Sequence, residues 1–201
     1  MSRVARTKLL ILLVVIVVAG GTVALAVVTD FALPVLLGVL ALALAIRTVQ
    51  RRVLREFFQG RRLLAAGRPE EALELFRRCR ARLQAEPWRL RWFVRVSLYT
   101  PSADAMLLNY IGSAHLSAGH LDEAEQAFRE ALAQDPLFAV PHYNRAVLAA
   151  VRGDRTAAER HLAEAARLGF PGGGMNDVTR RAQAIAARLR TARPAAGGPK
   201  Q

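Results

Sequence analysis

Histidine, cysteine and glycine supply the side chains and loops from which many catalytic and metal sites are built, but this chain does not arrange them in such a site. Its four histidines are His115, His120, His142 and His161. They form neither a His-Glu-x-x-His motif nor a cluster with cysteine. The single Cys79 is expected to be a buried structural thiol. Gly172–Gly174 lack the Lys-Ser/Thr that completes a phosphate-binding loop. We therefore expect no catalytic residue, no metal and no cofactor, and a function other than that of an enzyme.

The least ordinary pattern of charged and aromatic residues lies at 87–104, PWRLRWFVRVSLYTPSAD. Its alternation is a strand signal, yet Trp88, Trp92 and Tyr99 also share one helical face, and an all-helical context favours helix. Trp and Tyr prefer the headgroup zone of a membrane, where Arg reaches phosphates. The candidate membrane-interface residues are Trp88, Arg89, Arg91, Trp92, Arg95 and Tyr99. The alternatives are that the segment lengthens a helix and packs on its neighbours, or that it binds nucleic acid through Arg and stacking aromatics.

The net charge of +13 is unevenly distributed along the 201 residues. Residues 1–55 hold seven basic side chains and one acidic side chain, whereas residues 105–170 hold six and eight. The positive charge therefore gathers near the N-terminus, in the middle and in the tail. That pattern suits an anionic membrane surface at least as well as a nucleic acid, which is not the partner we expect. The strong excess of Arg over Lys is typical of a GC-rich bacterial genome.

Residues 1–50 predict a transmembrane helical hairpin with basic flanks. Residues 9–28 are twenty consecutive residues without a charge, and 31–46 are again apolar. Twenty helical residues span roughly 30 Å, about the hydrocarbon thickness of a bilayer. Asp30 can cap the second helix, whose first turn tolerates Pro34.

The orientation of the hairpin is predicted from its basic flanks. These are Arg3, Arg6 and Lys8 before the first span, and Arg47, Arg51, Arg52 and Arg55 after the second. By the positive-inside rule, both termini and the rest of the chain face the cytoplasm, which predicts an inner-membrane protein with two spans. A cleaved signal peptide with a site near 24–26 is one alternative. A buried hydrophobic hairpin in a soluble protein is the other.

Three segments repeat one pattern: GRPEEALELF at 67–76, GHLDEAEQAF at 119–128 and GDRTAAERHL at 153–162. The last two are 34 residues apart, and the first two are 52 apart, which is one such period plus 18 inserted residues. A period of 34 is that of the tetratricopeptide repeat, TPR. Residues 105–138 resemble this family at Leu108, Ile111, Gly112, His115, Ala124, Phe128, Ala131 and Pro136. Residues 139–172 and 53–86 resemble it at fewer positions.

The resemblance implies an all-α fold in which helix pairs stack into a solenoid. Small Gly112 and Ala124 would lie where the two helices of a repeat cross. A further helix is expected at 175–192, where Val178, Ala182, Ile185 and Leu189 form an apolar stripe. We predict that it caps the solenoid, and that the tail at 193–201 is disordered. The expected chain is thus a transmembrane hairpin, a short TPR α-solenoid and a C-terminal capping helix.

The resemblance also implies a concave groove lined by the first helix of each repeat. The family's groove positions fall on Arg61, Met106, Asn109, Tyr110, Ser113, Tyr143, Asn144 and Val147. Asn can pair with a peptide backbone, and Tyr supplies rigid contact area. The carboxylate clamp of chaperone-type repeats is not reproduced, so recognition of a C-terminal carboxylate is not expected.

These features together predict a membrane-anchored adaptor that binds a protein or peptide partner in its groove at the cytoplasmic face. One alternative is an envelope-side assembly factor or secretion-linked chaperone, with the opposite orientation or a cleaved anchor. A third reading is a membrane-tethered nucleic-acid binder that uses the basic insertion and tail.

Overall fold

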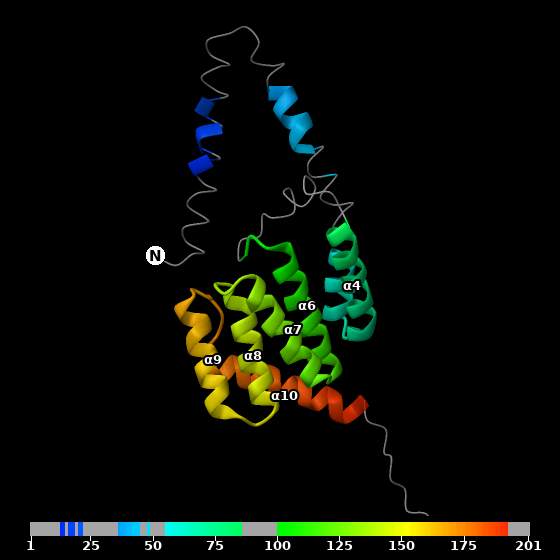
Figure 1. The fold of residues 1–201 in the computed structure, drawn as a ribbon, viewed down its shortest axis with the longest axis vertical. Helices are drawn as coiled ribbons and strands as arrows, with labels where there is room; N and C mark the ends of the chain where they lie inside the picture. The colour runs from blue at the N-terminus through cyan, green and yellow to red at the C-terminus, as the bar shows by residue number, and fades with distance from the viewer. Residues whose placement is uncertain are drawn as a thin grey trace, which may run out of the picture.

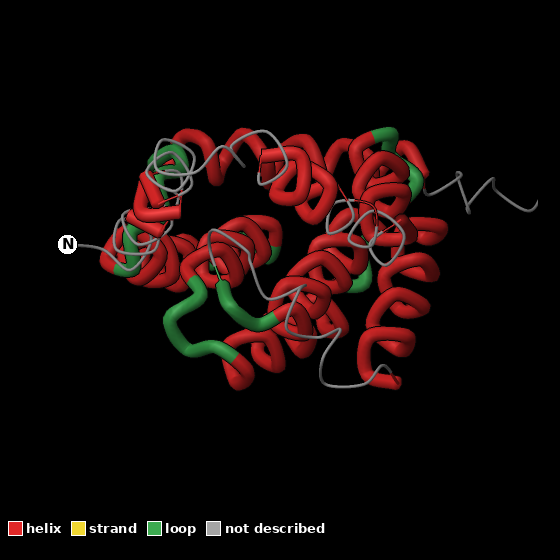
Figure 2. The backbone as a smooth tube through the Cα atoms, turned by 90° about the horizontal axis from the view of Figure 1, so that it is seen from above, coloured by secondary structure: helices red, strands yellow, loops and turns green. Residues whose placement is uncertain are grey.

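The computed structural model describes residues 13, 14, 16–18, 20, 21, 36–44, 48, 55–85 and 100–192. Within these residues all regular structure is helical, and Figure 2 shows helices joined by short loops. The all-α class expected from the sequence is confirmed for this part of the chain. Most of the predicted hairpin, the candidate membrane-interface residues Trp88–Tyr99 and the tail at 193–201 lie outside the described residues. Among the helices that the structure does describe, none combines the length and the apolar character that crossing a membrane requires.

Seven helices are described beyond residue 54, and six of them form three consecutive pairs. The pairs are α3 (Arg55–Ala65) with α4 (Pro69–Ala85), α6 (Ala103–Ala118) with α7 (Leu121–Gln134), and α8 (Ala139–Val151) with α9 (Arg155–Arg167). The last helix is α10 (Met175–Ala192). In each pair the two helices are joined by a turn containing Gly67, Gly119 or Gly153, with φ of 76°, 87° and 81°. Glycine adopts this left-handed conformation without the steric cost that a Cβ would add, so the chain can reverse tightly.

Each pair stacks on the next because its own two helices cannot bury all of its apolar surface. The second helix of one pair packs on the first helix of the following pair, α4 on α6 and α7 on α8 (Figure 1). One buried cluster joins the first two pairs through Phe57, Phe76 and Leu107. A second cluster joins the last two pairs through Phe128, Tyr143 and Leu148. Between the pairs, Arg145 of α8 also makes a half-buried ion pair with Glu125 of α7 at 2.6 Å.

A glycine facing a phenylalanine ring sets how closely the two helices of a pair approach. A Cβ added to Gly60 would lie 2.7 Å from Cε1 of Phe76, and one added to Gly112 would lie 2.6 Å from Cε1 of Phe128. Both phenylalanine residues are fully buried. In the third pair the equivalent positions are Ala146 and Leu162. Glycine is replaced by the larger alanine on the first helix, and phenylalanine by the smaller leucine on the second.

We predict that Gly112→Ala destabilises the solenoid, because the new methyl group overlaps a fixed ring. Overpacking of this kind costs about 1–3 kcal/mol, and the helix propensity gained by Ala offsets only part of it. Urea unfolding of the full chain in mild detergent, followed by circular dichroism, measures the change.

The matched control is the double variant with Phe128→Leu, which recreates the Ala–Leu pairing of the third repeat. The two substitutions should couple favourably, by about 0.5–3 kcal/mol in a double-mutant cycle. An unchanged unfolding midpoint for Gly112→Ala would contradict the close approach of α6 and α7.

Two histidines of the third pair are placed where burial disfavours their charged form. His142 of α8 and His161 of α9 have ring centroids 6.4 Å apart. Burial, with the nearby Arg145 and Arg160 as the next causes, lowers the pKa of His161 to about 4. Burial also lowers the pKa of His142. The folded protein therefore holds both imidazoles neutral under conditions in which an unfolded chain would protonate them.

This arrangement predicts that the free energy of unfolding falls as the pH drops from about 6.5 towards about 4, because the unfolded chain binds the proton first. His161→Gln should flatten this dependence. Unfolding midpoints of the two proteins, measured at several pH values in this range, give the result, and equal slopes would contradict the assignment.

Candidate binding groove

The eight groove residues expected from the sequence lie on the first helices of the three pairs, and we call the surface they form the groove face. These helices are neighbours in space, because α3 contacts α6 and α6 contacts α8. The structure divides the groove face into an open part on α3 and the N-terminal half of α6, a polar centre, and a part on α8 that another helix covers.

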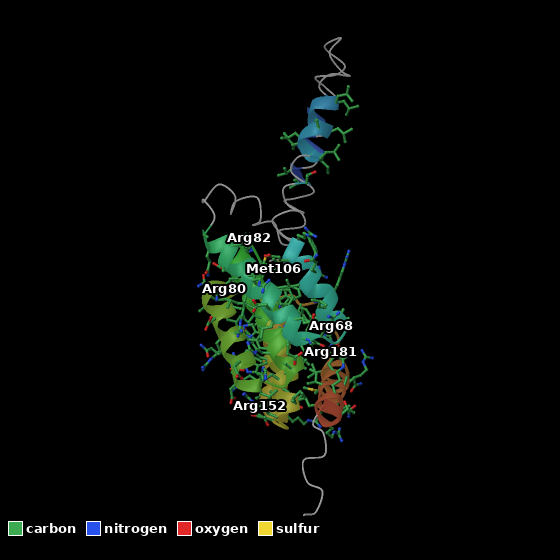
Figure 3. All side chains as sticks on the ribbon, turned by 90° about the vertical axis from the view of Figure 1, so that its right-hand side faces the viewer. Arg68, Arg80, Arg82, Met106, Arg152 and Arg181 are labelled. Carbon is green, nitrogen blue, oxygen red and sulfur yellow. The ribbon has the colours of Figure 1, made fainter. Side chains whose placement is uncertain are left out.

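The open part of the groove face is an aromatic cluster with an arginine over it. The ring of Tyr110 meets Phe57 edge-on at 4.9 Å and lies 5.4 Å from Phe76. The guanidinium carbon of Arg61 lies 5.7 Å from the centroid of the Tyr110 ring, within the range of a cation–π contact. Arg61 is exposed, and Tyr110 and Met106 (labelled in Figure 3) are half-buried. This part therefore offers apolar area next to an accessible positive charge.

The polar centre of the groove face ties the second pair to the third. The side-chain amide of Asn144 donates hydrogen bonds to Oδ1 of Asn109 at 2.8 Å and to Oγ of Ser113 at 3.3 Å. Asn109 is only 4% exposed. The sequence suggested that these asparagines pair with a peptide backbone. The structure shows their side chains bonded to one another, so their first role is to fix α8 against α6.

The remaining two groove residues, Tyr143 and Val147, are covered. They are 2% and 3% exposed, and both belong to the buried cluster that contains Val178 of α10. The sequence placed them on an accessible surface, and in the structure they lie beneath a helix of the same chain.

The position of α10 accounts for this burial. Figure 1 shows α10 running crosswise to α8, and it packs mainly on α8, with smaller contacts to α6 and α9. At its far end Leu189 reaches the turn between α6 and α7, where it covers Gly119.

The sequence predicted that this helix caps the end of the solenoid. A helix that continued the stack would pack on α9, the second helix of the preceding pair, as α6 packs on α4 and α8 on α7. The observed α10 packs mainly on α8 and only slightly on α9. The surface that it would cover stays open: a cleft of about 370 Å³ lies along Leu162, Ala163 and Ala166 of α9. Gly172–Gly174 border the same cleft, at the point where the chain turns from α9 to α10.

A polar cluster fixes the first turn of α10 on the groove face. The hydroxyl of Tyr143 donates a hydrogen bond to Asp177, and Arg180 forms an ion pair with the same carboxylate. The guanidinium carbon of Arg181 lies 5.2 Å from the Tyr143 ring centroid. Burial and the hydrogen bond to Asp177 raise the pKa of Tyr143 to about 12. The hydrogen bond from Tyr143, with the nearby arginines, lowers the pKa of Asp177. The pair therefore stays a neutral phenol and a carboxylate at physiological pH.

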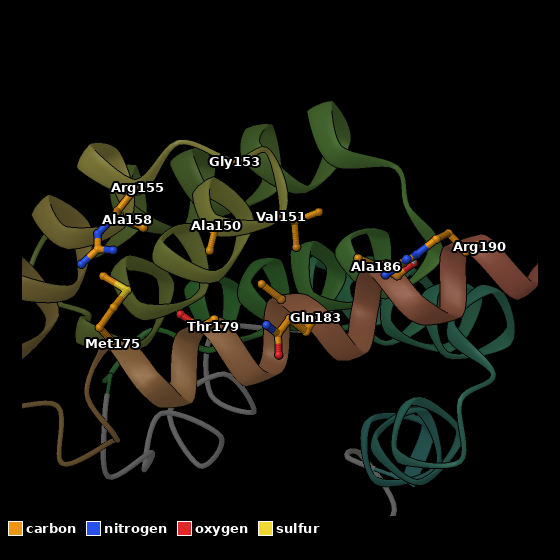
Figure 4. A pocket seen from close by; sticks show the side chains of 11 residues that line it. Ala150, Val151, Gly153, Arg155, Ala158, Met175, Thr179, Gln183, Ala186 and Arg190 are labelled. Atoms are coloured by element: carbon orange, nitrogen blue, oxygen red, sulfur yellow. Dashed lines mark hydrogen bonds between the residues drawn. The ribbon is translucent and has the colours of Figure 1, made fainter.

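Further along, α10 does not fit closely against its neighbours. A cleft of about 340 Å³ separates it from the C-terminal end of α8 and the start of α9. Figure 4 shows Ala150 and Val151 on one side of this cleft and Thr179 and Gln183 on the other. The α10 residues that line this cleft include Ala182 and Ala186, whose small side chains leave the space between α10 and α8 unfilled.

The described residues contain no group of three or more His, Cys, Asp or Glu side chains that could hold a metal ion. Cys79 is buried, and burial together with Glu56 raises the pKa of its thiol to about 11, so it stays protonated and unreactive at neutral pH.

Residues 105–138 match the family model of the tetratricopeptide repeat. These residues are a tetratricopeptide repeat. They comprise most of α6, all of α7 and the whole connection to α8. No match was found among curated proteins. A tetratricopeptide repeat is generally a binding module for protein partners, so this match supports a role in protein interaction.

The sequence located the groove positions on their helices but missed the residues that cover them. The sequence predicts that Val178 and Leu189 belong to an apolar stripe, but it does not predict the surface on which this stripe packs. Asp177 and Arg181, which meet Tyr143, carried no signal of their own. Helical spacing shows which side of a helix is apolar, but it does not show which of two apolar surfaces the helix covers.

Proposed function

We propose that this protein is a membrane-anchored adaptor whose groove face binds a protein partner at the cytoplasmic side of the membrane. The proposal is supported by the open part of the groove face, in which Met106 and Tyr110 belong to the tetratricopeptide repeat at 105–138 and Arg61 lies on the preceding helix pair. Arg61 there presents an accessible charge above Tyr110, next to half-buried Met106. Such a surface suits a partner segment that places an apolar side chain beside a carboxylate.

The proposal of an anchor is supported by apolar side chains in the N-terminal part of the chain. The described large hydrophobic residues there are all exposed, from 42% at Val39 to 69% at Val17. Large apolar side chains exposed in this number need a lipid phase or a partner to cover them. The uncharged run at 9–28 and the basic residues on both flanks support two spans, with the repeats on the cytoplasmic side. An anchor would raise the local concentration of a partner near the membrane.

We expect the full chain to stay with the membrane fraction after an alkaline carbonate wash. The matched variant carries Leu40→Arg and Leu42→Arg, and each Arg costs about 2.5–3.5 kcal/mol at the centre of a spanning helix. It should be released in part, or fail to insert. Complete release of the unmodified chain would contradict an integral anchor.

We expect Arg61→Glu to reduce partner capture about tenfold in cells, because it reverses the charge at the centre of the open surface. The measurement is in-cell crosslinking, purification in mild detergent and quantitative mass spectrometry. The control is Arg129→Glu, which makes the same charge change at an exposed position of α7.

Equal loss in both variants would indicate that net charge matters rather than the groove. Equal capture by both variants and the unmodified chain would place the binding surface elsewhere. Recovery of nucleic acid alone, released by salt, would instead favour a basic nucleic-acid binder.

A further inference from the structure

We propose that the part of the groove face on α8 is a helix-binding site that α10 occupies in place of a partner helix. The partner would be an amphipathic helix with a carboxylate in its first turn and apolar residues at the spacing of Val178, Ala182, Ile185 and Leu189. It would bind when α10 is displaced. This inference rests on the proposed adaptor function. It adds the class of partner and the way in which α10 regulates its binding.

The contacts of α10 are those expected of a bound ligand helix. Its apolar stripe faces groove residues, since Val178 is fully buried in one cluster with Tyr143 and Val147. Its remaining surface carries exposed arginines, including Arg180 and Arg188. An amphipathic helix laid into an apolar groove is an established mode of peptide recognition, with anchors at i, i+4, i+7 and i+11.

The first turn of α10 gives the chemistry that the site selects. Tyr143 donates its hydroxyl hydrogen bond to the Asp177 carboxylate. A helix without a hydrogen-bond acceptor at this position would leave the hydroxyl of a 2%-exposed tyrosine without a partner. The same tyrosine ring lies 5.2 Å from the guanidinium carbon of Arg181, one turn after the aspartate. The site therefore favours an Asp or Glu followed by an apolar residue, with a cation one turn further on.

The attachment of α10 is weak enough for exchange. Among residues 175–191, only Val178 and Ala182 are buried, whereas α6 has nine buried residues. The outer helices α3 and α9 also bury few residues, but α10 contacts its main neighbour, α8, less extensively than α3 contacts α4 or α9 contacts α8. Elements with few buried contacts open locally at a small part of the cost of global unfolding. The exposed Gly172–Gly174 linker lets α10 leave while it stays attached to the solenoid. A short flexible linker holds its segment at an effective concentration on the order of millimolar, so a free partner must compete against that value.

The cleft beneath α10 leaves room for a helix that would fit this surface better than α10 does. Ala182 and Ala186 leave about 340 Å³ next to Ala150 and Val151. A helix with larger apolar side chains at these two positions would fill the space and bind more tightly than α10 does. A site filled imperfectly by its own chain can be opened by a partner, because the partner gains contacts that α10 lacks.

The test measures binding of a fluorescent peptide of sequence 175–192 to the full chain in mild detergent. Val178→Glu should undock α10 and expose the site, so this variant should bind the peptide at least about tenfold more tightly than the unmodified protein. Ala186→Leu should fill the cleft, hold α10 in place and weaken peptide binding below that of the unmodified protein. Peptides that carry Asp177→Asn or Val178→Glu should bind the opened variant at least about threefold and tenfold more weakly.

Because Val178→Glu removes a buried residue, Asp177→Ala serves as a second opening variant that leaves the core unchanged. It should also bind the peptide more tightly than the unmodified chain. The inference is overturned if both variants melt with the whole solenoid at lower temperature and gain no affinity for the peptide, since α10 is then an integral part of the core. It is also overturned if the unmodified chain is a dimer that either variant dissociates, since the occupant would then be a second copy.

The adaptor function can be judged separately from this inference. If the opened variants do not bind the peptide more tightly but Arg61→Glu loses the partner, the adaptor function stands and only the role of α10 is rejected. If the opened variants bind the peptide more tightly but Arg61→Glu has no effect on partner capture, the helix-binding site on α8 is supported. The open part of the groove face is then not the surface that binds the partner.

Discussion

The structure depends on one constraint: a pair of short helices cannot bury its apolar residues alone. Phe128 is covered only because α7 meets α6 at Gly112 and α8 arrives from the next pair. The same need repeats at each pair and aligns α3, α6 and α8 side by side. The groove face is the consequence, because the surface left over by stacking is shared by the first helices of all three pairs.

The last helix meets the same constraint with a different solution. After α9 the chain could continue the stack, or it could turn back over the groove face. The linker Gly172–Gly174 and the bond between Tyr143 and Asp177 accompany the second arrangement. As a result, the outer surface of α9 stays open along Leu162 and Ala166, and the groove surface of α8 is closed. The position of α10 therefore links the end of the solenoid to the exposure of the groove face.

Much of this architecture could be predicted from the sequence, because it is set by local and periodic signals. The glycines in the turns, the small Gly112 where two helices cross and the apolar stripe of α10 all appear at fixed spacing. The phenylalanine ring that Gly112 faces, that of Phe128, was not predicted. The roles of Asn109 and Tyr143 could not be predicted in this way. Both occupy positions that normally line a groove, but Asn109 is bonded to Asn144 and Tyr143 lies beneath Val178. Which partner a groove residue meets depends on contacts across about 35 residues of sequence, and spacing within one helix carries no information about them.

Amide hydrogen exchange of the full chain in mild detergent, compared helix by helix, distinguishes a displaceable α10 from a helix that is an integral part of the solenoid. If α10 is a displaceable occupant of the groove face, its amides should exchange much faster than those of α6 and α8, through local opening that leaves the solenoid folded. Groove amides near Tyr143 should then lose protection when α10 is undocked, and regain it when a competing helix binds. Exchange of α10 at the same slow rate as α6 and α8, under conditions where only global unfolding exposes them, would contradict the account.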